Sequence, residues 1–444
     1  MIEKPELFVV EADWVVPVES EPIPNGFVAI AKGFIEFVGT PLPDKYRSAQ
    51  KFHLAGFAIL PGLINAHCHL EFSDLSQPLQ SDDSFPEWIR QVLSYRNSLV
   101  VNPEQTTNVR QRAIARGIRE SYESGVRWVV DMTTQPWNPI WIEEAVSAIV
   151  SGMQPWLVPS TPIAIQPCFE IVDIAKNRID ETIVFVENQM NAPERKTLGR
   201  MGYAPHAPYT ASRNVTARSA RMSQIGNRLV TMHLAESLDE LEWLESRKGS
   251  FLELLAPILS AGYFDEIGQI SEHVQLLATS WRSMIAHGNY LSQSDLCNLA
   301  IHSQNMAIVH CPRTHRYFGH RHSGSLKYPL AQRLELGVRH LLGTDSRASN
   351  PDLNLWSEAK WMRLEHPAIP SISILKMITT DAAEFLDLQN MYGAIRVGRT
   401  SALTAVKLQG HSPKPNTLAC VDRLYDALLA SDTNSTPLEM VLDS

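Results

Sequence analysis

Short apolar runs alternate with longer helix-like segments after Pro61, and this alternation is the strongest constraint on the fold. The eight runs are GLINAH, VRWVVDMTT, MQPWLVPS, LGRMGYAPH, LVTMHLAES, SMIAHGN, MAIVHCPR and VRHLLGTDS. Strands that alternate with helices form a parallel sheet, because a parallel connection has to cross back over the sheet. Eight such units predict an α/β fold, a (β/α)8 or TIM barrel, over residues 61–390.

The residue pattern at the two ends of the chain differs from that of the middle. Residues 1–60 contain LFVVEADWVVPV, GFVAIAKGFIEFVG and KFHLAGFAILPG, which are rich in β-branched and aromatic residues, with Gly and Pro between them. After the barrel, GAIRVGRTSALTAVKLQG returns to this strand-like texture. We therefore predict a small β-sandwich domain built from residues 1–60 and 391–430, and a poorly ordered tail over residues 431–444.

Composition narrows the class of protein. The 444 residues carry a formal net charge of −9, whereas a surface that binds nucleic acid needs a basic face. No apolar run reaches the length of about 18 residues that a membrane span requires. The five cysteines form no C-x-x-C pair, and the first residues do not resemble a signal peptide. We expect a cytoplasmic protein that acts on a small molecule and binds neither nucleic acid nor a membrane.

Histidines and carboxylates stand where the apolar runs end. The first run continues as PGLINAHCHLEF, whose His67 and His69 share one face because side chains alternate along a strand. The other residues of this kind are His206, His233 with Glu236 after it, His287 and Asp345. A barrel carries its active site at the C-terminal ends of its strands, and imidazoles with a carboxylate bind zinc-like metals. The pattern therefore predicts a metal-dependent active site.

Several of the 15 histidines have a simpler explanation, and a lone H-x-H pair would be weak evidence for a metal. Those in helical or loop texture are expected at the surface or satisfied within the core: His53, His273, His302, His322, His340 and His366. Cys68 faces away from its two histidine neighbours, so we interpret it as a packing residue. The prediction of a site rests on the joint pattern at several strand ends.

Six motifs resemble the amidohydrolase superfamily. They are PGLINAHCHLEF, APHAPYT, HLAESLDE, AHGNYL, HCPRTHRYFGH and GTDSRASNPDLNLW. In order and spacing they resemble the branch that contains deaminases of the cytosine, guanine, adenosine and S-adenosylhomocysteine type and triazine chlorohydrolases. The resemblance implies a barrel with a small β domain, and a hydrolase that acts on carbon–nitrogen bonds in cyclic amidines.

The resemblance also implies a role for each matching residue. It assigns the metal to His67, His69, His233 and Asp345, and catalysis to Glu236, His287 and Asp345. Glu236 would shuttle protons, His287 would contact the attacking water or the forming oxyanion, and His206 would contact the substrate. Taken alone, Glu236 would be better explained as a carboxylate in the first turn of a helix, where the macrodipole favours it, and its position next to His233 shifts the interpretation to catalysis.

One divalent metal ion is expected, with Zn²⁺ as the first choice and Fe(II) as the alternative. Family members that hold two metals carry a carboxylated lysine at the end of the fourth strand. The stretch that we take for this region, MQPWLVPSTP, has no lysine. Three histidines and an aspartate suit either ion, and such an ion lowers the pKa of bound water.

The segment after H-x-H predicts a substrate. HLEFS followed by F-x-x-W-x-x-x-V-x-x-x-R resembles the aminodeoxyfutalosine deaminases, which convert a 6-aminopurine nucleoside to its 6-oxo form. Their substrate carries a carboxylated aromatic group, and arginine suits a carboxylate because its planar fork binds both oxygens. The candidate substrate contacts are Glu71, Trp88, Arg96, His206, Arg313 and Arg316. Ordinary helix packing stays an alternative for Trp88 and Arg96. Three further histidines near the mouth receive no role other than that of candidate substrate contacts: His310, His315 and His320.

Two other functions stay open at this stage. The same scaffold suits a chlorohydrolase or another C–N hydrolase that acts on a triazine, cytosine or guanine-type ring. A non-enzymatic relative of such barrels would have lost ligands, and none is missing here. The resemblance leaves the oligomeric state open, and a homodimer is compatible with it.

Overall fold

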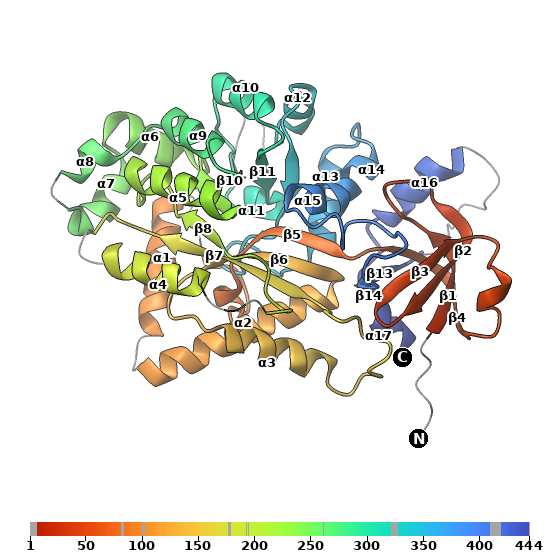
Figure 1. Ribbon diagram of the computed structural model, residues 1–444. Coiled ribbons are helices and arrows are strands. Elements are labelled where there is room, and N and C mark those ends of the chain that lie inside the picture. The colour runs from red at the N-terminus through yellow and green to blue at the C-terminus, as the bar shows by residue number, and fades with distance from the viewer. Residues whose placement is uncertain are drawn as a thin grey trace.

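The chain forms a barrel of strands surrounded by helices, with a smaller sheet beside it (Figure 1). The computed structural model describes residues 7–80, 84–99, 103–175, 179–191, 193, 195–260, 262–320, 327–408 and 419–443. The first described strand, β1 (Leu7–Val15), belongs to the smaller sheet, and the last described helix, α17 (Leu438–Leu442), lies beside it. This placement fits a small β domain that takes strands from both ends of the sequence.

Eight parallel strands form the barrel, in sequence order around it. They are β5 (Leu63–Cys68), β6 (Val126–Thr133), β7 (Ala164–Ile171), β8 (Gly202–Pro205), β9 (Leu229–Leu234), β10 (Arg282–His287), β11 (Met306–His310) and β12 (His340–Leu342). Residues directly after β12 close the ring, since the carbonyl of His67 accepts hydrogen bonds from the amides of Thr344 (3.0 Å) and Asp345 (3.1 Å). The predicted (β/α)8 barrel is confirmed.

Gly343 makes this closure possible. A Cβ atom at this position would lie 2.7 Å from the Cβ of His67 and 2.8 Å from its carbonyl oxygen. These distances are shorter than van der Waals contact, so the last strand reaches the first only with glycine in the GTD motif.

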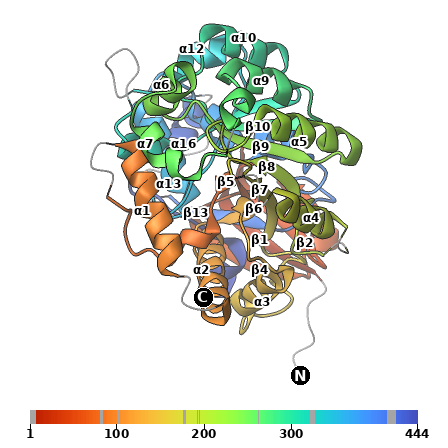
Figure 2. The same ribbon diagram turned by 90° about the vertical axis from the view of Figure 1, so that its left-hand side faces the viewer.

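Helices surround the strands (Figure 2). They are α1 (Phe85–Ser98), α2 (Pro103–Glu123), α3 (Pro139–Val150), α4 (Ile179–Met190), α5 (Arg213–Gly226), α6 (Leu238–Ser246), α7 (Ser250–Leu255), α8 (Tyr263–Glu266), α9 (Ile270–Ala278), α10 (Gln293–Ile301), α11 (Pro312–Tyr317), α12 (Leu330–Glu335), α13 (Leu355–Glu365), α14 (Ser371–Met377) and α15 (Thr380–Phe385). Asparagine or serine caps begin several of them, because a side-chain oxygen satisfies a free amide of the first turn: Asn138, Ser212, Ser237, Ser292 and Asn354.

The barrel interior is filled with buried side chains below the strand ends. Small and medium residues alternate there with larger ones, as in Ala66, Met132 and Val309, and α15 packs against the same cluster through Phe385. A second and larger apolar cluster joins the outer faces of the strands to the surrounding helices. Within the described ranges, no helix combines the length and the apolar character that crossing a membrane requires.

The smaller sheet has six strands in the order β14-β13-β4-β1-β2-β3. Its members are β1 (Leu7–Val15), β2 (Ile23–Ala31), β3 (Phe34–Gly39), β4 (Gln50–Pro61), β13 (Leu403–Lys407) and β14 (Ser435–Pro437). β1 and β4 run parallel, and the other neighbouring pairs are antiparallel. The prediction of a small β domain built from both ends of the chain is confirmed, and its described strands belong to this one sheet.

Only Gly62 separates β4 of the small sheet from β5 of the barrel. A Cβ atom at Gly62 would lie 2.1 Å from Cγ of Arg127 and 2.5 Å from the carbonyl oxygen of Ala402. Glycine is therefore required where the two sheets meet, because any side chain would collide with the neighbouring strands.

The third barrel strand is not the predicted run MQPWLVPS. β7 has the sequence AIQPCFEI, and residues 153–160 form turns and bends instead. Trp156 and Leu157 are apolar because they pack on the small sheet, where the rings of Trp156 and Phe8 lie 5.6 Å apart. Pro167 lies inside β7 and hides the strand in the sequence, because proline cannot donate to a strand ladder.

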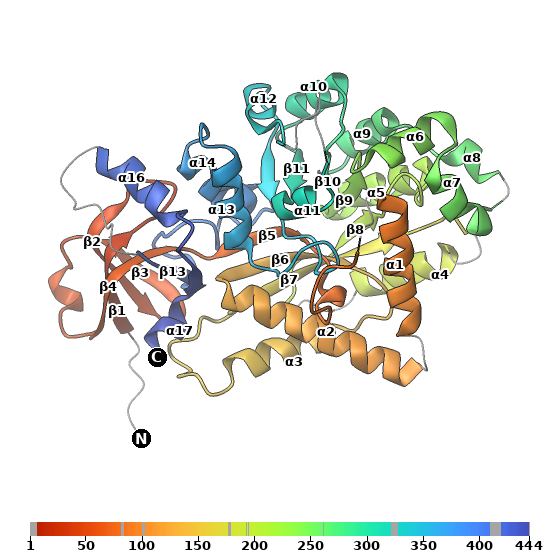
Figure 3. The same ribbon diagram turned by 180° about the vertical axis from the view of Figure 1, so that it is seen from behind.

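The C-terminal residues also differ from the prediction, because they do not form a loose tail. β14 pairs with β13, and α17 (Leu438–Leu442) follows it and contacts both of these strands (Figure 3). α16 (Ala419–Leu428), which precedes β14 in the chain, contacts α14. Glu439 of α17 is buried and accepts hydrogen bonds from both terminal nitrogens of Arg127 at 2.6 Å, and from the Tyr122 hydroxyl at 2.8 Å. The polar composition of this segment gave the wrong prediction, since a buried ion pair holds it in place.

Replacing Glu439 with alanine should lower the free energy of unfolding by about 3–5 kcal/mol, because Arg127 then keeps a buried charge without its partner. The measurement is urea unfolding, read from the midpoint at an unchanged m-value. Glu19→Ala is the control: Glu19 pairs with Arg399 at 3.2 Å but is 35% exposed, so its loss should change stability by less than about 1 kcal/mol. Equal losses in the two variants would contradict the importance of this buried pair.

Candidate active site

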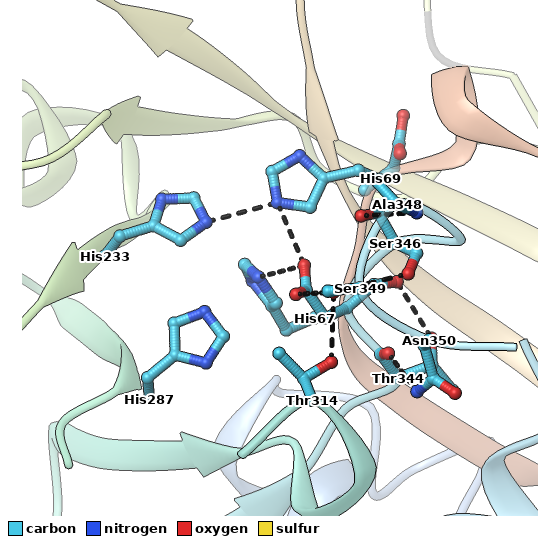
Figure 4. Close-up of polar contacts among 12 residues, drawn as sticks. His67, His69, His233, His287, Thr314, Thr344, Ser346, Ala348, Ser349 and Asn350 are labelled. Atoms are coloured by element: carbon cyan, nitrogen blue, oxygen red, sulfur yellow. Dashed lines mark hydrogen bonds and ion pairs between the residues drawn. The ribbon is translucent and has the colours of Figure 1, made fainter. Parts of the chain in front are cut away.

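Four side chains from three parts of the barrel meet at the C-terminal ends of the strands. His67 and His69 come from β5 and the residue after it, His233 from β9, and Asp345 from the loop after β12. Nε2 of His69 lies 3.1 Å from Nε2 of His233 and 3.5 Å from Oδ1 of Asp345, and Nε2 of His67 lies 3.7 Å from the same oxygen. Figure 4 shows the imidazoles pointing toward one another.

This cluster fits a divalent metal ion. Both ring nitrogens of His67 are buried and have no hydrogen-bond partner, and such orphaned groups are costly unless something binds them. Burial lowers the pKa of His233 to about 3, so its ring is neutral and offers a lone pair. Burial acts to raise the pKa of Asp345, but the interactions with His67, His69 and His287 outweigh it and hold that pKa below its usual range. Three imidazoles and a carboxylate suit Zn²⁺ or Fe(II).

A second layer of hydrogen bonds orients these groups. Nδ1 of His233 lies 3.1 Å from the carbonyl oxygen of His206, which makes Nδ1 the donor and leaves Nε2 with its lone pair facing the cluster. Ser349 donates to Oδ2 of Asp345 at 2.5 Å, and the Ser349 and Thr314 hydroxyls lie 3.1 Å apart. These contacts fix one ring tautomer and one carboxylate rotamer in advance of binding.

Glu236 and His287 face each other beside this cluster. Oε1 of Glu236 lies 3.5 Å from Nε2 of His287, and both side chains are buried. Burial raises the pKa of Glu236, and the carboxylates of Asp345 and Glu240 raise it further. Glu236 is therefore protonated more readily than an exposed glutamate, which suits a group that must donate a proton.

A cavity of about 430 Å³ opens from these residues. Its inner end is polar and includes His69, His206, His233, Glu236, His287 and Asp345. Its walls are apolar and come mainly from η2 (Leu70–Phe72), α1, α7 and η4 (Ala256–Ile258): Phe72, Phe85, Trp88, Ile89, Val92, Leu93, Leu254, Leu255 and Ile258. α1 and α7 contact each other and lie together beside the strand ends (Figure 2). The cavity has the size and character of a small-molecule site.

Three predicted substrate contacts line this cavity: Trp88, Arg96 and His206. Trp88 is anchored by a hydrogen bond from Nε1 to the carbonyl oxygen of Ala348 at 3.0 Å. The Nδ1 atom of His206 lies 2.7 Å from the Thr210 hydroxyl, which leaves the Nε2 side of the ring for other contacts. Helix packing alone therefore does not account for Trp88 and Arg96.

Glu71 does not line the cavity and supports Arg96 instead. Its Oε1 accepts a hydrogen bond from Arg96 at 2.5 Å, and its Oε2 lies 3.0 Å from Nη2 of Arg110 and accepts from Thr134 at 3.1 Å. Burial acts to raise the pKa of Glu71, but the two arginines lower it overall. Glu71 is a buried carboxylate that orients Arg96.

The structure does not bring the two later arginines to the cavity. Arg313 binds Glu358 at 2.7 Å and Asp352 at 2.6 Å, so its guanidinium is neutralised within the fold. Arg316 is exposed and is not among the lining residues. The prediction of Arg313 as a substrate contact rested on its position directly after the seventh strand, and it did not foresee the two carboxylates that α13 and the preceding loop supply.

Glu170, near the end of β7, is a cavity residue that was not predicted from the sequence. Its Oε1 is buried without a hydrogen-bond partner, 3.9 Å from Nδ1 of His69, and its Oε2 lies 3.8 Å from Nη2 of Arg96. It lines the cavity and groups with His206 and His233. The apolar run AIQPCF directly before Glu170 could have indicated a strand that ends at a polar residue. It was overlooked because the third strand was predicted at MQPWLVPS.

The fourth strand also differs from the region taken for it. The strand is β8, and His206 is the residue that follows it. No lysine stands at this position, so the absence of a carboxylated lysine holds although MQPWLVPSTP was the wrong stretch. The ligand set of a lysine-bridged pair of metals is therefore not present.

Three of the histidines that were expected at the surface or within the core have partners in the fold. His53 lies 3.2 Å from Glu11 on the small sheet, His273 lies 3.0 Å from the Thr216 hydroxyl, and His340 lies 3.1 Å from that of Tyr328. His322 lies outside the described residues. These contacts fit ordinary surface and core histidines.

A comparison of the chain with known proteins identifies its family. The model of the Amidohydrolase family matches residues 58–437. The chain belongs to the amidohydrolase family. A 5-methylthioadenosine/S-adenosylhomocysteine deaminase of Pyrococcus furiosus is 30% identical over 397 residues, which is 86% of this chain and 82% of that protein. The family and this relative establish a hydrolase that acts on carbon–nitrogen bonds.

Solved structures share the fold. The aminofutalosine deaminase of Helicobacter pylori in complex with methylthio-coformycin superposes with a TM-score of 0.73 at 20% identity, covering 96% of this chain and 97% of that one. The triazine hydrolase of Arthrobacter aurescens gives a TM-score of 0.71 at 18% identity, covering 94% and 90%. The predicted resemblance to this branch of the amidohydrolases is confirmed.

Replacing His67 or Asp345 with alanine should abolish metal binding and activity together, because each removes one of four converging donors. Ser349→Ala should lower metal affinity by about 10- to 100-fold, because it frees the Asp345 carboxylate to rotate. Metal content by mass spectrometry and competition with a chelator measure both effects. His53→Ala, on the small sheet, is the control and should keep the wild-type metal content. Full metal content in His67→Ala would contradict the assigned site.

Proposed function

We propose that this enzyme hydrolytically deaminates a 6-aminopurine nucleoside to its 6-oxo product, with release of ammonia. The observation that carries the proposal is the position of Glu236. Its buried carboxyl group lies 3.5 Å from His287 and lines the polar end of the cavity, beside the four proposed metal ligands. A carboxylic acid there can serve both a ring nitrogen and a departing amine.

The relatives support this substrate class. The Pyrococcus furiosus relative is described as a deaminase of 5-methylthioadenosine and S-adenosylhomocysteine, and the Helicobacter pylori structure as an aminofutalosine deaminase. We place the present enzyme with these nucleoside deaminases, with aminodeoxyfutalosine as the candidate substrate. The apolar walls beyond the polar end favour a nucleoside that carries an apolar or aromatic appendage.

We assign one divalent metal ion, Zn²⁺ or Fe(II), to His67, His69, His233 and Asp345. When bound, such an ion polarises water and lowers its pKa toward neutrality. The Oδ1 atom of Asp345 faces the histidines and Oδ2 accepts from Ser349, so the carboxylate is oriented to take a proton from the attacking water. This proton then becomes available to the leaving nitrogen.

Glu236 and His287 complete the proposed reaction. Glu236 donates a proton to the ring nitrogen next to C6 while the water oxygen bonds to C6. His287 lies beside this position and stabilises the oxygen as charge develops on it. The proton that Asp345 took from the water passes through Glu236 to the amino nitrogen, the bond from C6 to this nitrogen breaks, and ammonia leaves. The remaining proton on the oxygen returns to Glu236 as the carbonyl forms.

Arg96, Glu170 and His206 are the proposed contacts for the rest of the substrate. Arg96 lies between Glu71 and Glu170, so its charge is largely compensated before any ligand binds. Glu170 and His206 offer hydrogen-bonding groups at the edge of the polar end. A carboxylate on the substrate appendage would compete with Glu71 and Glu170 for Arg96. The contribution of that carboxylate to binding is therefore measured in the assay below.

Metal-loaded enzyme should release ammonia from a 6-aminopurine nucleoside and not from cytosine, guanine or aminotriazines, because the apolar cavity extends well beyond one ring. The assay uses adenosine, 5′-methylthioadenosine, S-adenosylhomocysteine and aminodeoxyfutalosine, with metal content measured on the same sample. A comparison of kcat/KM between nucleosides with a carboxylated and with an uncharged appendage tests whether Arg96 binds the substrate carboxylate. Chloride release from a chlorotriazine without any ammonia would replace this function with the chlorohydrolase alternative.

Glu236→Gln should retain the metal and lose turnover by at least about 100-fold, because the amide cannot transfer the proton. Ammonia release and metal content are measured on one preparation. Glu245→Gln is the matched control, since Glu245 is an exposed glutamate on the following helix, α6, and should behave as wild type. Near-wild-type activity in Glu236→Gln would remove Glu236 from the mechanism.

A further inference from the structure

The loops that follow β9 and β10 are joined to each other by their main chains. The first loop carries Glu236, and the second begins directly after His287. The amide of Gly288 donates to the carbonyl oxygen of Leu234 at 3.1 Å, and the amide of Tyr290 donates to that of Ala235 at 2.9 Å. Hydrogen bonds therefore link the main chain beside Glu236 to the main chain directly after His287.

Asn289 adds a side-chain link to Glu236 itself. Its Nδ2 donates to the carbonyl oxygen of Glu236 at 3.0 Å, and Asn289 is only 2% exposed. From the other side, the carboxylate of Glu240 accepts hydrogen bonds from the amides of Ala235 at 3.1 Å and Glu236 at 2.8 Å. The peptide groups on both sides of the Glu236 Cα are thus held.

The backbone at these loops adopts conformations that need such restraint. Ala235 has a φ of 52° and His287 a φ of 65°, in the left-handed region that side chains with a Cβ rarely occupy. Residues persist there only where the surroundings determine the backbone. The hydrogen bonds from Asn289 and to Glu240 restrain the backbone at Ala235 and Glu236, next to the proposed catalytic carboxyl group.

Arg333 anchors the second loop from outside the barrel. It belongs to α12, is 2% exposed, and donates to the carbonyl oxygens of Gly288 at 2.9 Å and Asn289 at 2.8 Å. The guanidinium also contacts the Tyr328 ring and hydroxyl. One rigid fork thereby fixes the two residues that precede Tyr290.

We propose that Asn289 is a positioning residue that holds Glu236 opposite His287, with Arg333 as the anchor of Asn289. This inference rests on the proposed function, in which Glu236 must reach both a ring nitrogen and the leaving amine. Loss of the Asn289 amide lets the Glu236 main chain relax away from the second loop. The Glu236 carboxyl group then lies out of position for proton transfer to the substrate, although the group itself is still present.

The test compares two leaving groups in metal-loaded, full-length Asn289→Ala enzyme. In both substrates the water oxygen bonds to C6, and the bond from C6 to the amino nitrogen or to chlorine breaks. Ammonia leaves only after its nitrogen gains a proton, whereas chloride leaves without one. On a 6-aminopurine ribonucleoside, kcat should fall by about 10- to 100-fold, the loss that a displacement near 1 Å produces. On the 6-chloropurine ribonucleoside the loss should be clearly smaller, with KM and metal content unchanged.

Two further variants sharpen the comparison. Glu236→Gln should shift the preference between amino and chloro substrates in the same direction, because Asn289 acts through Glu236. Asn305→Ala is the matched control: its Nδ2 also donates to main-chain carbonyls, those of Ala278 at 3.0 Å and Ser280 at 3.1 Å, but at the other end of the strands. It should leave the preference unchanged.

An equal loss on both substrates, or unchanged kcat, would overturn the positioning role. If the wild-type enzyme releases no ammonia from any nucleoside, the proposed function fails, and a crystal structure of Asn289→Ala decides this inference separately. Displacement of the Glu236 carboxyl group from its position 3.5 Å from Nε2 of His287 would support the inference. A carboxyl group that stays in place would overturn it.

Discussion

The closure of the barrel at His67 is the contact on which the candidate site depends. The carbonyl oxygen of His67 accepts the amides of Thr344 and Asp345, so the last strand end lies directly against the first. The histidines of PGLINAHCHLEF and the aspartate of GTD are far apart in the sequence and meet only through this contact. A barrel that failed to close would hold the same residues, but it would not present one set of donors to one ion.

The site keeps several ionisable groups away from water, and the fold supplies a compensating partner for nearly every one. Arg96 is paired with Glu71, Asp345 with the imidazoles and Ser349, and the Glu240 carboxylate with two backbone amides. Low local polarity strengthens each of these contacts and raises the cost of breaking any of them. Some buried atoms of the site have no hydrogen-bond partner, and they belong to cavity-lining residues or proposed metal ligands: Oε1 of Glu170, both ring nitrogens of His67, Nδ1 of His69 and Nε of Arg96. The unsatisfied groups of the site thus coincide with the positions where a ligand is proposed.

Much of the fold and the polar cluster was predictable, because both depend on periodic and local signals. The alternation of runs gave the barrel, and the polar residues at the run ends identified His67, His69, His233, Glu236, His287 and Asp345 as neighbours. The errors have a common cause, which is that partners distant in sequence decide the outcome. Trp156 is apolar to cover the small sheet, Glu439 is buried to meet Arg127, and Arg313 is held by Glu358. The two glutamates beside Arg96 illustrate the same limit of prediction. Glu71 binds Arg96 from outside the cavity and Glu170 lines the cavity, and this difference depends on the folded position of Arg96.

The single-residue link at Gly62 gives the small sheet a direct mechanical connection to the chemistry. β4 passes through Gly62 into β5, and β5 ends one residue before His69, so one nearly continuous strand runs from the small sheet to two of the proposed metal ligands. A strand is stiff along its axis, and no loop is present here to absorb a rotation between the two sheets. A rotation of the small sheet relative to the barrel would therefore displace His67 and His69. Recombining this barrel with a foreign small sheet would need the strand direction at Gly62 preserved as strictly as the ligands themselves.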